Sequence, residues 1–382
     1  MSKAKFQLLG RLRACAAVVV IAILALAAFA ATASALPARF WGVVPQAAPT
    51  QEQFQRLHRG GVASTRIAID WSAAQPSRGG AVIWDGIDTM VERAAVANIE
   101  VLPFITGAPS WAVPSVRVPG GGSAKAPAHL PASGPAAGAW KSFLAQAVDR
   151  YGPAGSFWAT HPALPERPIR AWQVWNEENF KYFVAKPNPI EYGRLVKLSY
   201  GAIKGVDPGA QVVLGGMFAR PKGSRTATGK HKSLNWYASD FLEAMYKRTP
   251  GVKAKFNDIA LHPYSKNFWE LTPEITEFRR VLTTNHDPAK GLWITELGWS
   301  SQPPNRSNIF AKGLSGQAQQ LRGAFTLLRN NQPRWRLQRV FWFSVDDAEG
   351  ACNFCDGSGL FGEGFVPKKS WFEYVKFAGG TP

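Results

Sequence analysis

The sequence predicts one α/β domain that folds as a closed (β/α)8 TIM barrel. Strand-like apolar runs alternate with amphipathic helical stretches from residue 40 onward, which is typical of a parallel sheet. Eight such runs occur, and this number suits a closed barrel with long loops better than an open sheet. The runs are continuously apolar, as expected where both sheet faces are covered. The alternative is a doubly wound sheet, but no glycine-rich nucleotide turn follows the first run.

The expected elements alternate along the chain. The strands are Phe40–Val44, Ser64–Asp70, Ile99–Ile105, Ile169–Trp175, Gln211–Leu214, Asp258–Leu261, Leu292–Glu296 and Val340–Ser344. The helices include Trp84–Asn98, Ala139–Tyr151, Pro189–Val206, Trp236–Arg248, Pro273–Thr284, Gly316–Asn330 and Ser370–Phe377.

Two connections are unusually long. Ala112–Gly138, after the third strand, is rich in glycine, proline and alanine, and Phe218–Asn235, after the fifth, carries a cluster of basic residues. Loops that follow strands lie on the C-terminal rim of a barrel, where active sites are built. We therefore expect both loops to wall or cover a cleft rather than to link domains.

Residues 1–35 have the pattern of a secretory signal peptide, which leaves 36–382 as the barrel domain. Basic residues precede a long uncharged stretch, and Ala33-Ser34-Ala35 supplies a small-x-small cleavage site. The alternative is an uncleaved anchor, because the stretch is long enough to span a bilayer. Cleavage after Ala35 predicts a secreted protein, in solution or associated with the cell envelope, without stable membrane insertion.

The chain is strongly basic. Its formal net charge is +18, and removal of the four basic residues of the leader would leave +14. Such a charge attracts polyanions, and an anionic cell-envelope polymer is the expected partner class. No nucleic-acid-binding motif is present, so nucleic acid is not expected, and the protein is expected to be a monomer.

Two of the three cysteines remain after removal of the leader, Cys352 and Cys355. In an exported protein this C-x-x-C pair is expected to form a local disulfide. It supplies too few ligands for a structural zinc site.

Two glutamates end strand-like runs and lie close to tryptophans in the sequence, Glu177 on the fourth run and Glu296 on the seventh. Side chains there point into the mouth of a barrel from nearly opposite sides. Cleavage of a glycosidic bond requires two carboxyl groups, one as proton donor and one as nucleophile or base, and aromatic rings can stack on the sugar. The pair therefore predicts a carbohydrate substrate, with neither cofactor nor metal.

Further segments accompany these glutamates in a fixed order. They are Thr65–Trp71, Leu102-Pro103-Phe104 with Ala108–Trp111, Trp175-Asn176-Glu177, His262-Pro263-Tyr264, Thr295-Glu296-Leu297-Gly298-Trp299, Phe341-Trp342-Phe343 and Pro367–Phe372. This series resembles the clan A retaining glycoside hydrolases with a (β/α)8 barrel, and most closely families 39 and 5. The resemblance covers most of the chain after the leader, and the ordered set is far more specific than any member alone.

The resemblance implies a role for each matching residue. Glu177 would be the general acid and then the general base, and Glu296 the nucleophile that forms a glycosyl-enzyme ester. The implied substrate-site residues are Asn176 for the sugar 2-hydroxyl, Arg66 and Tyr264 for the charge of Glu296, Trp342 for the floor under the sugar, and His262 for the same wall.

Some of these positions have plainer alternatives. Arg66 could form a structural ion pair, His262 could be a core histidine, and Trp342 could be ordinary barrel packing. Many relatives have proline after the acid/base residue, whereas this chain has Glu178. Its carboxylate could alter the pKa of Glu177, or it could point away and bind Arg or Lys.

The expected function is hydrolysis of a β-linked polysaccharide or oligosaccharide by double displacement. A transglycosylase would use the same residues and differ only in what attacks the ester. A non-catalytic barrel that binds envelope polysaccharide is the alternative of another class, but a binding module does not need paired carboxylates. The sugar and its linkage stay open.

Overall fold

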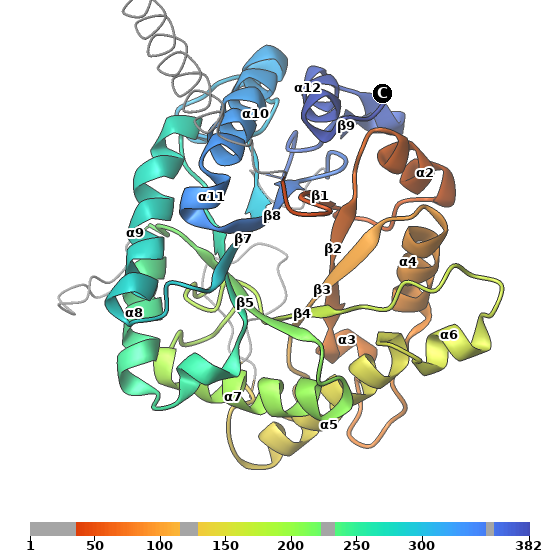
Figure 1. Ribbon diagram of the computed structural model, residues 1–382, viewed down its shortest axis with the longest axis vertical. Coiled ribbons are helices and arrows are strands. Elements are labelled where there is room, and N and C mark those ends of the chain that lie inside the picture. Colours follow the sequence, from red (N-terminus) through yellow and green to blue (C-terminus); the bar gives the residue numbers. More distant parts are fainter. Residues whose placement is uncertain (1–35, 115–128, 223–233, 349–354) are drawn as a thin grey trace, which may run out of the picture. The chain divides into compact units, whose positions relative to one another are not determined.

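Eight parallel strands close into a barrel in the order β1 to β8, with β8 paired to β1 (Figure 1). The computed structural model describes residues 36–114, 129–222, 234–348 and 355–382. The strands are β1 Trp41–Val44, β2 Ser64–Asp70, β3 Glu100–Thr106, β4 Ala171–Val174, β5 Gln211–Phe218, β6 Asp258–His262, β7 Gly291–Leu297 and β8 Leu337–Phe343. The predicted fold class is confirmed.

Helices surround the ring of strands (Figure 1). The longer ones are α2 Gln51–Arg59, α4 Asp85–Val96, α5 Gly134–Tyr151, α7 Pro189–Val206, α8 Ala238–Arg248, α9 Leu271–Thr284, α10 Gly313–Asn330 and α12 Lys369–Ala378. The shorter pieces are α3 Trp71–Ala74, α6 Ser156–Thr160 and α11 Gln332–Trp335, with a small hairpin of β9 Phe361–Gly362 and β10 Val366–Pro367.

The predicted elements are found, most of them with shifted ends, while Ser64–Asp70 and Pro189–Val206 have the predicted ends. Helix α5 begins at Gly134, so the loop expected over 112–138 is shorter than predicted, and its residues 115–128 lie outside the described part of the chain. Helix α2 was not among the predicted elements. Its start has a capping box in which Thr50 and Gln53 bond reciprocally, and this signature was readable in the sequence.

The barrel interior has an apolar layer with a polar and aromatic layer above it. The apolar layer consists of Val44, Leu102, Ala171, Val213, Ala260, Trp293 and Phe341. Residues two positions further along a strand face the same side, and on four strands these are Phe104, Gln173, Thr295 and Phe343. The upper layer is therefore built from the strands themselves, on which positions are more rigid than on loops.

Gly216 on β5 leaves the space that this layer needs. A Cβ atom there would lie 1.8 Å from Nε2 of His262 and 2.5 Å from Oγ1 of Thr295. Both neighbours are fully buried, so neither can move away easily.

We therefore expect Gly216→Ala to lower the free energy of unfolding by about 1–3 kcal/mol through overpacking. Gly201→Ala is the matched control, because Gly201 lies inside α7 with nothing within 4 Å of an added Cβ. The control should gain about 0.5–1 kcal/mol. Urea denaturation measures both, and equal effects would contradict the packing argument.

Candidate active site

Glu296 reaches the barrel mouth because β7 is irregular where it carries this residue. In a regular strand Thr295 and Glu296 would point to opposite faces. The pairing of β7 with β8 shifts register between Ile294 and Leu297, and such an irregularity can re-aim a side chain. Both side chains consequently bond to groups on other strands of the barrel.

Glu177 lies just beyond the end of β4, where the backbone turns sharply. The φ angle is 71° at Trp175 and 45° at Glu177, a left-handed region that residues other than glycine rarely adopt. The amide of Glu177 donates to the carbonyl oxygen of Gly216 at 3.2 Å. Its Oε1 lies 2.8 Å from Nδ1 of His262, so backbone and side chain are both anchored.

The two carboxyl groups converge. One carboxylate oxygen each of Glu177 and Glu296 and a ring nitrogen of His262 all lie within 4.8 Å of one another. Glu177 is 4% exposed and Glu296 is 9% exposed. The structure thus brings together the two acids that the sequence singled out.

Arg66 holds the site together from β2. It is fully buried, and its three nitrogens donate to Oε1 of Gln173 at 2.7 Å, Oε1 of Glu296 at 2.6 Å and Oδ1 of Asn176 at 2.7 Å. Its guanidinium also stacks on the ring of Phe104 at 3.8 Å. Since Oδ1 of Asn176 is occupied, the amide NH2 is the group of Asn176 that can bind a ligand.

The ionised form of Glu296 is stabilised by more hydrogen-bond donors than that of Glu177. Burial raises its pKa, and this is opposed by the charge and hydrogen bond of Arg66 and by the hydroxyl of Tyr264, which donates to Oε2 at 2.9 Å. Both donors favour the ionised carboxylate.

Glu177 has the opposite environment. Burial is the largest cause that raises its pKa well above the usual range. The charge of Glu296 adds to it, the charge of Arg66 opposes it, and Glu178 adds a smaller contribution when ionised. Its hydrogen-bond partner is His262, whose own pKa is lowered well below its usual value by burial and by the charge of Arg66. A neutral imidazole cannot offset burial as a cation would, so Glu177 keeps its proton more readily than Glu296.

Trp342 does not form the floor that was predicted. It is fully buried and packs against Phe325 of α10 and against Trp299, and its Nε1 donates to the carbonyl of Ser358. The reason is strand alternation, because Phe341 faces the barrel interior and its neighbour must face the helices. Phe343 is the β8 residue beside the site, with its ring 6.3 Å from that of Tyr264.

The walls near the carboxylates are phenylalanines, which the sequence reasoning missed. The Tyr264 ring lies 5.7 Å from Phe218, in a stacked arrangement, and 6.1 Å from Phe310. Phe180 continues this row from Phe218 at 5.3 Å. These rings are only partly buried, so they can offer apolar faces to a ligand. They were missed in the sequence because mainly tryptophan was considered as the residue that stacks on a sugar.

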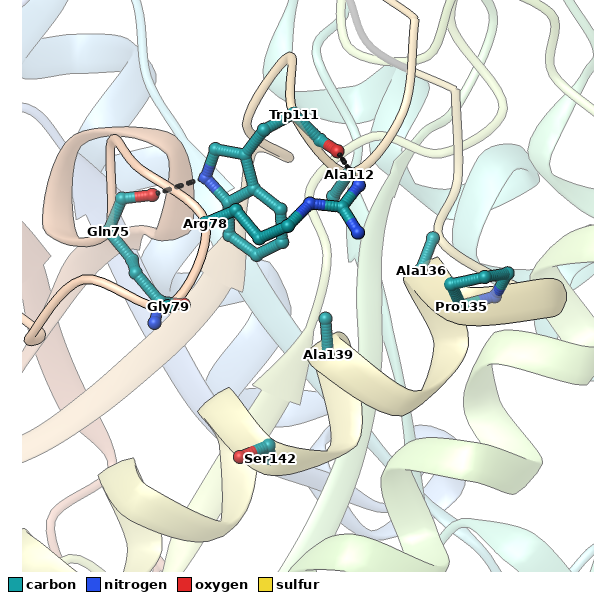
Figure 2. A pocket seen from close by; sticks show the side chains of 9 residues that line it. All are labelled: Gln75, Arg78, Gly79, Trp111, Ala112, Pro135, Ala136, Ala139 and Ser142. Atoms are coloured by element: carbon teal, nitrogen blue, oxygen red, sulfur yellow. Dashed lines mark hydrogen bonds between the residues drawn. The ribbon is translucent and has the colours of Figure 1, made fainter.

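The other tryptophans near the motifs pack outside the carboxylate site. Trp71 and Trp299 are fully buried. Trp111 instead lines a separate cavity of about 230 Å³ with Gln75, Arg78 and the start of α5. Figure 2 shows its indole nitrogen bonded to the Gln75 carbonyl and its own carbonyl bonded to Arg78.

Glu178 points away from Glu177, but toward neither Arg nor Lys. It is fully buried, and its Oε2 lies where a Cβ on Gly215 would be, at 1.9 Å. Within the described part of the chain neither of its carboxylate oxygens makes a hydrogen bond of good geometry. The polar group beside it is the hydroxyl of Tyr192, which donates to the carbonyl oxygen of Val174 and opposes the effect of burial on the pKa of Glu178. Burial raises its pKa to about 8, so it is neutral in the folded protein at pH 7.

Glu177, His262 and Glu296 are also the one set of ligand atoms, among the described residues, close enough to share a metal ion. These atoms already contact one another and Arg66. The guanidinium charge at Glu296 would repel a cation. The arrangement fits acid–base and nucleophilic chemistry better than metal binding.

Several predictions lie outside the described residues. Residues 1–35 and Cys352 are among them, so the signal peptide and the Cys352–Cys355 disulfide stay predictions. No helix of the described part is both long and apolar enough to cross a membrane.

The carboxylate pair at a barrel mouth defines the class, a (β/α)8 protein with the geometry of a glycosidase. Residues 213–364 match the family model described as glycosyl hydrolase catalytic core. No curated protein matches the sequence. The matched segment contains Glu296, His262 and Tyr264, while Glu177 precedes it.

Solved structures share the fold. A family 39 glycoside hydrolase from Bacteroides cellulosilyticus WH2 has a TM-score of 0.62 at 18% identity, covering 90% of this chain and 64% of that one. A β-xylosidase from Caulobacter crescentus CB15 has 0.57 at 16%, covering 89% and 68%. An intracellular xylanase from Thermoanaerobacterium saccharolyticum has 0.57 at 14%, covering 89% and 95%.

This chain therefore spans 64% of the length of the family 39 structure, and the likeness at such low identity concerns the fold. Together with the family-model match, it confirms the predicted resemblance to clan A glycoside hydrolases with a (β/α)8 barrel.

The environment of Glu178 makes a prediction about stability. In the unfolded chain this carboxyl group loses its proton near its ordinary pKa of 4.5, whereas in the folded protein it does so near 8. The folded state therefore binds the extra proton between these values, and stability falls as pH rises through this window. The contribution is present below pH 4.5 and lost above 8.

Glu178→Gln removes this proton exchange. Relative to the parent, the variant should gain stability by on the order of 1 kcal/mol per pH unit across the window. Denaturation at a series of pH values measures the difference. Glu92→Gln, on the exposed face of α4, is the control and should give a flat difference. If the difference in free energy of unfolding between Glu178→Gln and the parent does not change with pH, Glu178 is not buried in its protonated form.

Proposed function

We propose that this protein is a secreted retaining glycoside hydrolase that cleaves β-linked polysaccharide or oligosaccharide by double displacement. The supporting observation is the convergence of Glu177 and Glu296 within 4.8 Å, with an environment around each that differs in the required sense. Inverting enzymes hold their carboxyl groups about 6.5–9.5 Å apart to admit a water molecule. The short contact favours direct attack.

In the first step Glu296 attacks the anomeric carbon while the bond to the leaving oxygen breaks. Glu177 donates its proton to that oxygen, so the leaving sugar departs as an alcohol. A glycosyl ester of Glu296 and a carboxylate at Glu177 remain. Arg66 and Tyr264 hold the nucleophile ionised and oriented before the attack.

In the second step a water molecule attacks the anomeric carbon of the ester. Glu177 takes a proton from the water, and Glu296 leaves as a carboxylate. Two inversions give net retention, and both residues return to their starting protonation states. Asn176 has its amide NH2 available to bond the sugar 2-hydroxyl, a contact that strengthens in the transition state.

The substrate class follows from weaker signals. The formal net charge of +18, or +14 without the leader, favours an acidic polymer. Two structures with this fold are named as a β-xylosidase and a xylanase, so xylo-oligosaccharides with and without uronate substituents are the first substrates to compare. Identifying the first residue of the exported protein tests secretion, with Leu36 expected.

Replacement of the nucleophile provides the central test. We expect Glu296→Ala to abolish turnover, and a 2-fluoro glycoside to label Glu296 covalently in the parent protein. Glu177→Ala should instead lose most activity on poor leaving groups. With an activated glycoside, whose leaving group needs no proton, added azide should restore turnover and give a glycosyl azide of retained configuration. NMR of the first-formed product reads the anomer directly.

Undiminished activity of Glu296→Ala, or an inverted product, would exclude double displacement. Binding of polysaccharide without any labelling or turnover would favour the non-catalytic barrel. Transfer of the sugar to an added oligosaccharide in preference to water would favour the transglycosylase.

The outward direction of Trp342 predicts a contrast between neighbouring residues. Phe343→Ala removes a ring beside the site and should raise KM by roughly 2–10-fold, which corresponds to the usual worth of one aromatic contact. Trp342→Phe should lower the free energy of unfolding with little change in KM, because that side chain packs against α10. Steady-state kinetics and urea denaturation of both variants separate binding from packing. The reverse pattern would restore the original assignment of Trp342.

A further inference from the structure

A buried chain of hydrogen bonds leads from Arg66 to Glu177 through uncharged groups. Nε of Arg66 donates to Oε1 of Gln173 at 2.7 Å, and Nε2 of Gln173 donates to Oγ1 of Thr295 at 3.2 Å. Oγ1 of Thr295 lies 2.9 Å from Nε2 of His262, and Nδ1 of His262 lies 2.8 Å from Oε1 of Glu177. Gln173, Thr295 and His262 are all fully buried.

The direction of the first bonds is set by groups that can act in one way only. Arginine has donors and no acceptor, so Gln173 must present its oxygen to Arg66. The amide nitrogen of Gln173 then donates to the carbonyl oxygen of Leu214 at 3.0 Å and to Thr295. If the amide of Gln173 were flipped, its NH2 would face the N–H of Arg66, donor against donor. Its oxygen would then face the carbonyl oxygen of Leu214, acceptor against acceptor.

The direction of the next bond follows from Thr295. Its oxygen accepts from Gln173, and its own proton needs an acceptor. Within the described part of the chain, the remaining polar contact of this hydroxyl is Nε2 of His262. If Nε2 carried the ring proton instead, the buried hydroxyl proton would have no acceptor, which is costly.

We infer that Gln173 and Thr295 hold His262 as the tautomer protonated on Nδ1, so that His262 donates to Oε1 of Glu177 and confines the catalytic proton to Oε2. This inference rests on the proposed role of Glu177. Oε2 makes no hydrogen bond to any described residue, so it is the oxygen left for the substrate. His262, Thr295 and Gln173 are positioning residues that neither gain nor lose a proton.

The charges around the pair are compatible with a neutral ring. Burial and, after it, the charge of Arg66 from β2 lower the pKa of His262 and disfavour a protonated imidazole. Oε2 of Glu296 on β7 lies 3.5 Å from Nδ1, so the same N–H lies between two carboxylates and reduces their repulsion. The other ionisable groups that face Glu177 are Tyr264, which is bonded to Glu296, and Glu178, which points toward Gly215.

The tautomer can be read without any assay of activity. Long-range proton–nitrogen NMR distinguishes the protonated ring nitrogen from the unprotonated one, and the signal of His262 is identified by its absence in His262→Gln. We expect protonated Nδ1 and unprotonated Nε2 in the parent protein. A parent protein with its proton on Nε2 would overturn the inference, whether or not any glycoside is hydrolysed.

Thr295→Val tests the chain, with Thr295→Ser as the matched control that keeps the hydroxyl. The valine variant should lose the single-tautomer signal of His262. Its kcat/KM on an oligosaccharide should fall about tenfold, with the alkaline limb moved to higher pH, because the ionised form of Glu177 loses part of its donor. A dinitrophenyl glycoside, whose leaving group departs without protonation, should lose much less.

The serine control should keep the tautomer and the pH profile of the parent. Equal losses on both substrates, or a valine variant with an unchanged tautomer and pH profile, would overturn the inference. If Thr295→Val fails to fold, the NMR tautomer of His262 in the parent protein and in Thr295→Ser still tests the inference. A protein with the expected tautomer but no hydrolytic activity on any substrate would refute the proposed function alone.

Discussion

The ion pair between Arg66 and Glu296 is the contact on which the site depends. Arg66 is fully buried, and its nitrogens connect β2 to β4, to the segment after β4 and to β7. Removing one partner of a buried pair leaves an uncompensated charge in a medium of low polarity, at a cost of about 3–5 kcal/mol. The pair therefore ties the stability of the barrel mouth to the protonation state of Glu296.

The fold could be predicted from sequence because its signals are periodic and repeated. Continuous apolar runs such as Leu292–Glu296 become strands that are covered on both faces, and Pro189–Val206 is found as a helix with the predicted ends. The convergence of Glu177 and Glu296 followed from strand order alone, because strand ends of a closed parallel barrel meet at one rim.

Details of the site could not be predicted because they depend on small departures from regular strands. Trp342 and Phe343 are adjacent aromatics, and a one-residue difference in register exchanges the inward and outward positions. Thr295 and Glu296 both face inward only because the pairing of β7 shifts. Glu178 is accommodated against Gly215, a contact between β5 and the end of β4 that local sequence does not encode.

The difference between the two glutamates arises from connectivity and not from residue type. Both are buried and would repel each other if ionised, so one must hold a proton. Glu296 receives a cation and a phenol, whereas Glu177 receives an imidazole that is kept neutral by burial and by the same cation. The charge of Arg66 lowers the pKa of both acids, but Arg66 donates a hydrogen bond to Glu296 only. The two acids are therefore separated by their hydrogen-bond partners, a guanidinium and a phenol at Glu296 and a neutral imidazole at Glu177.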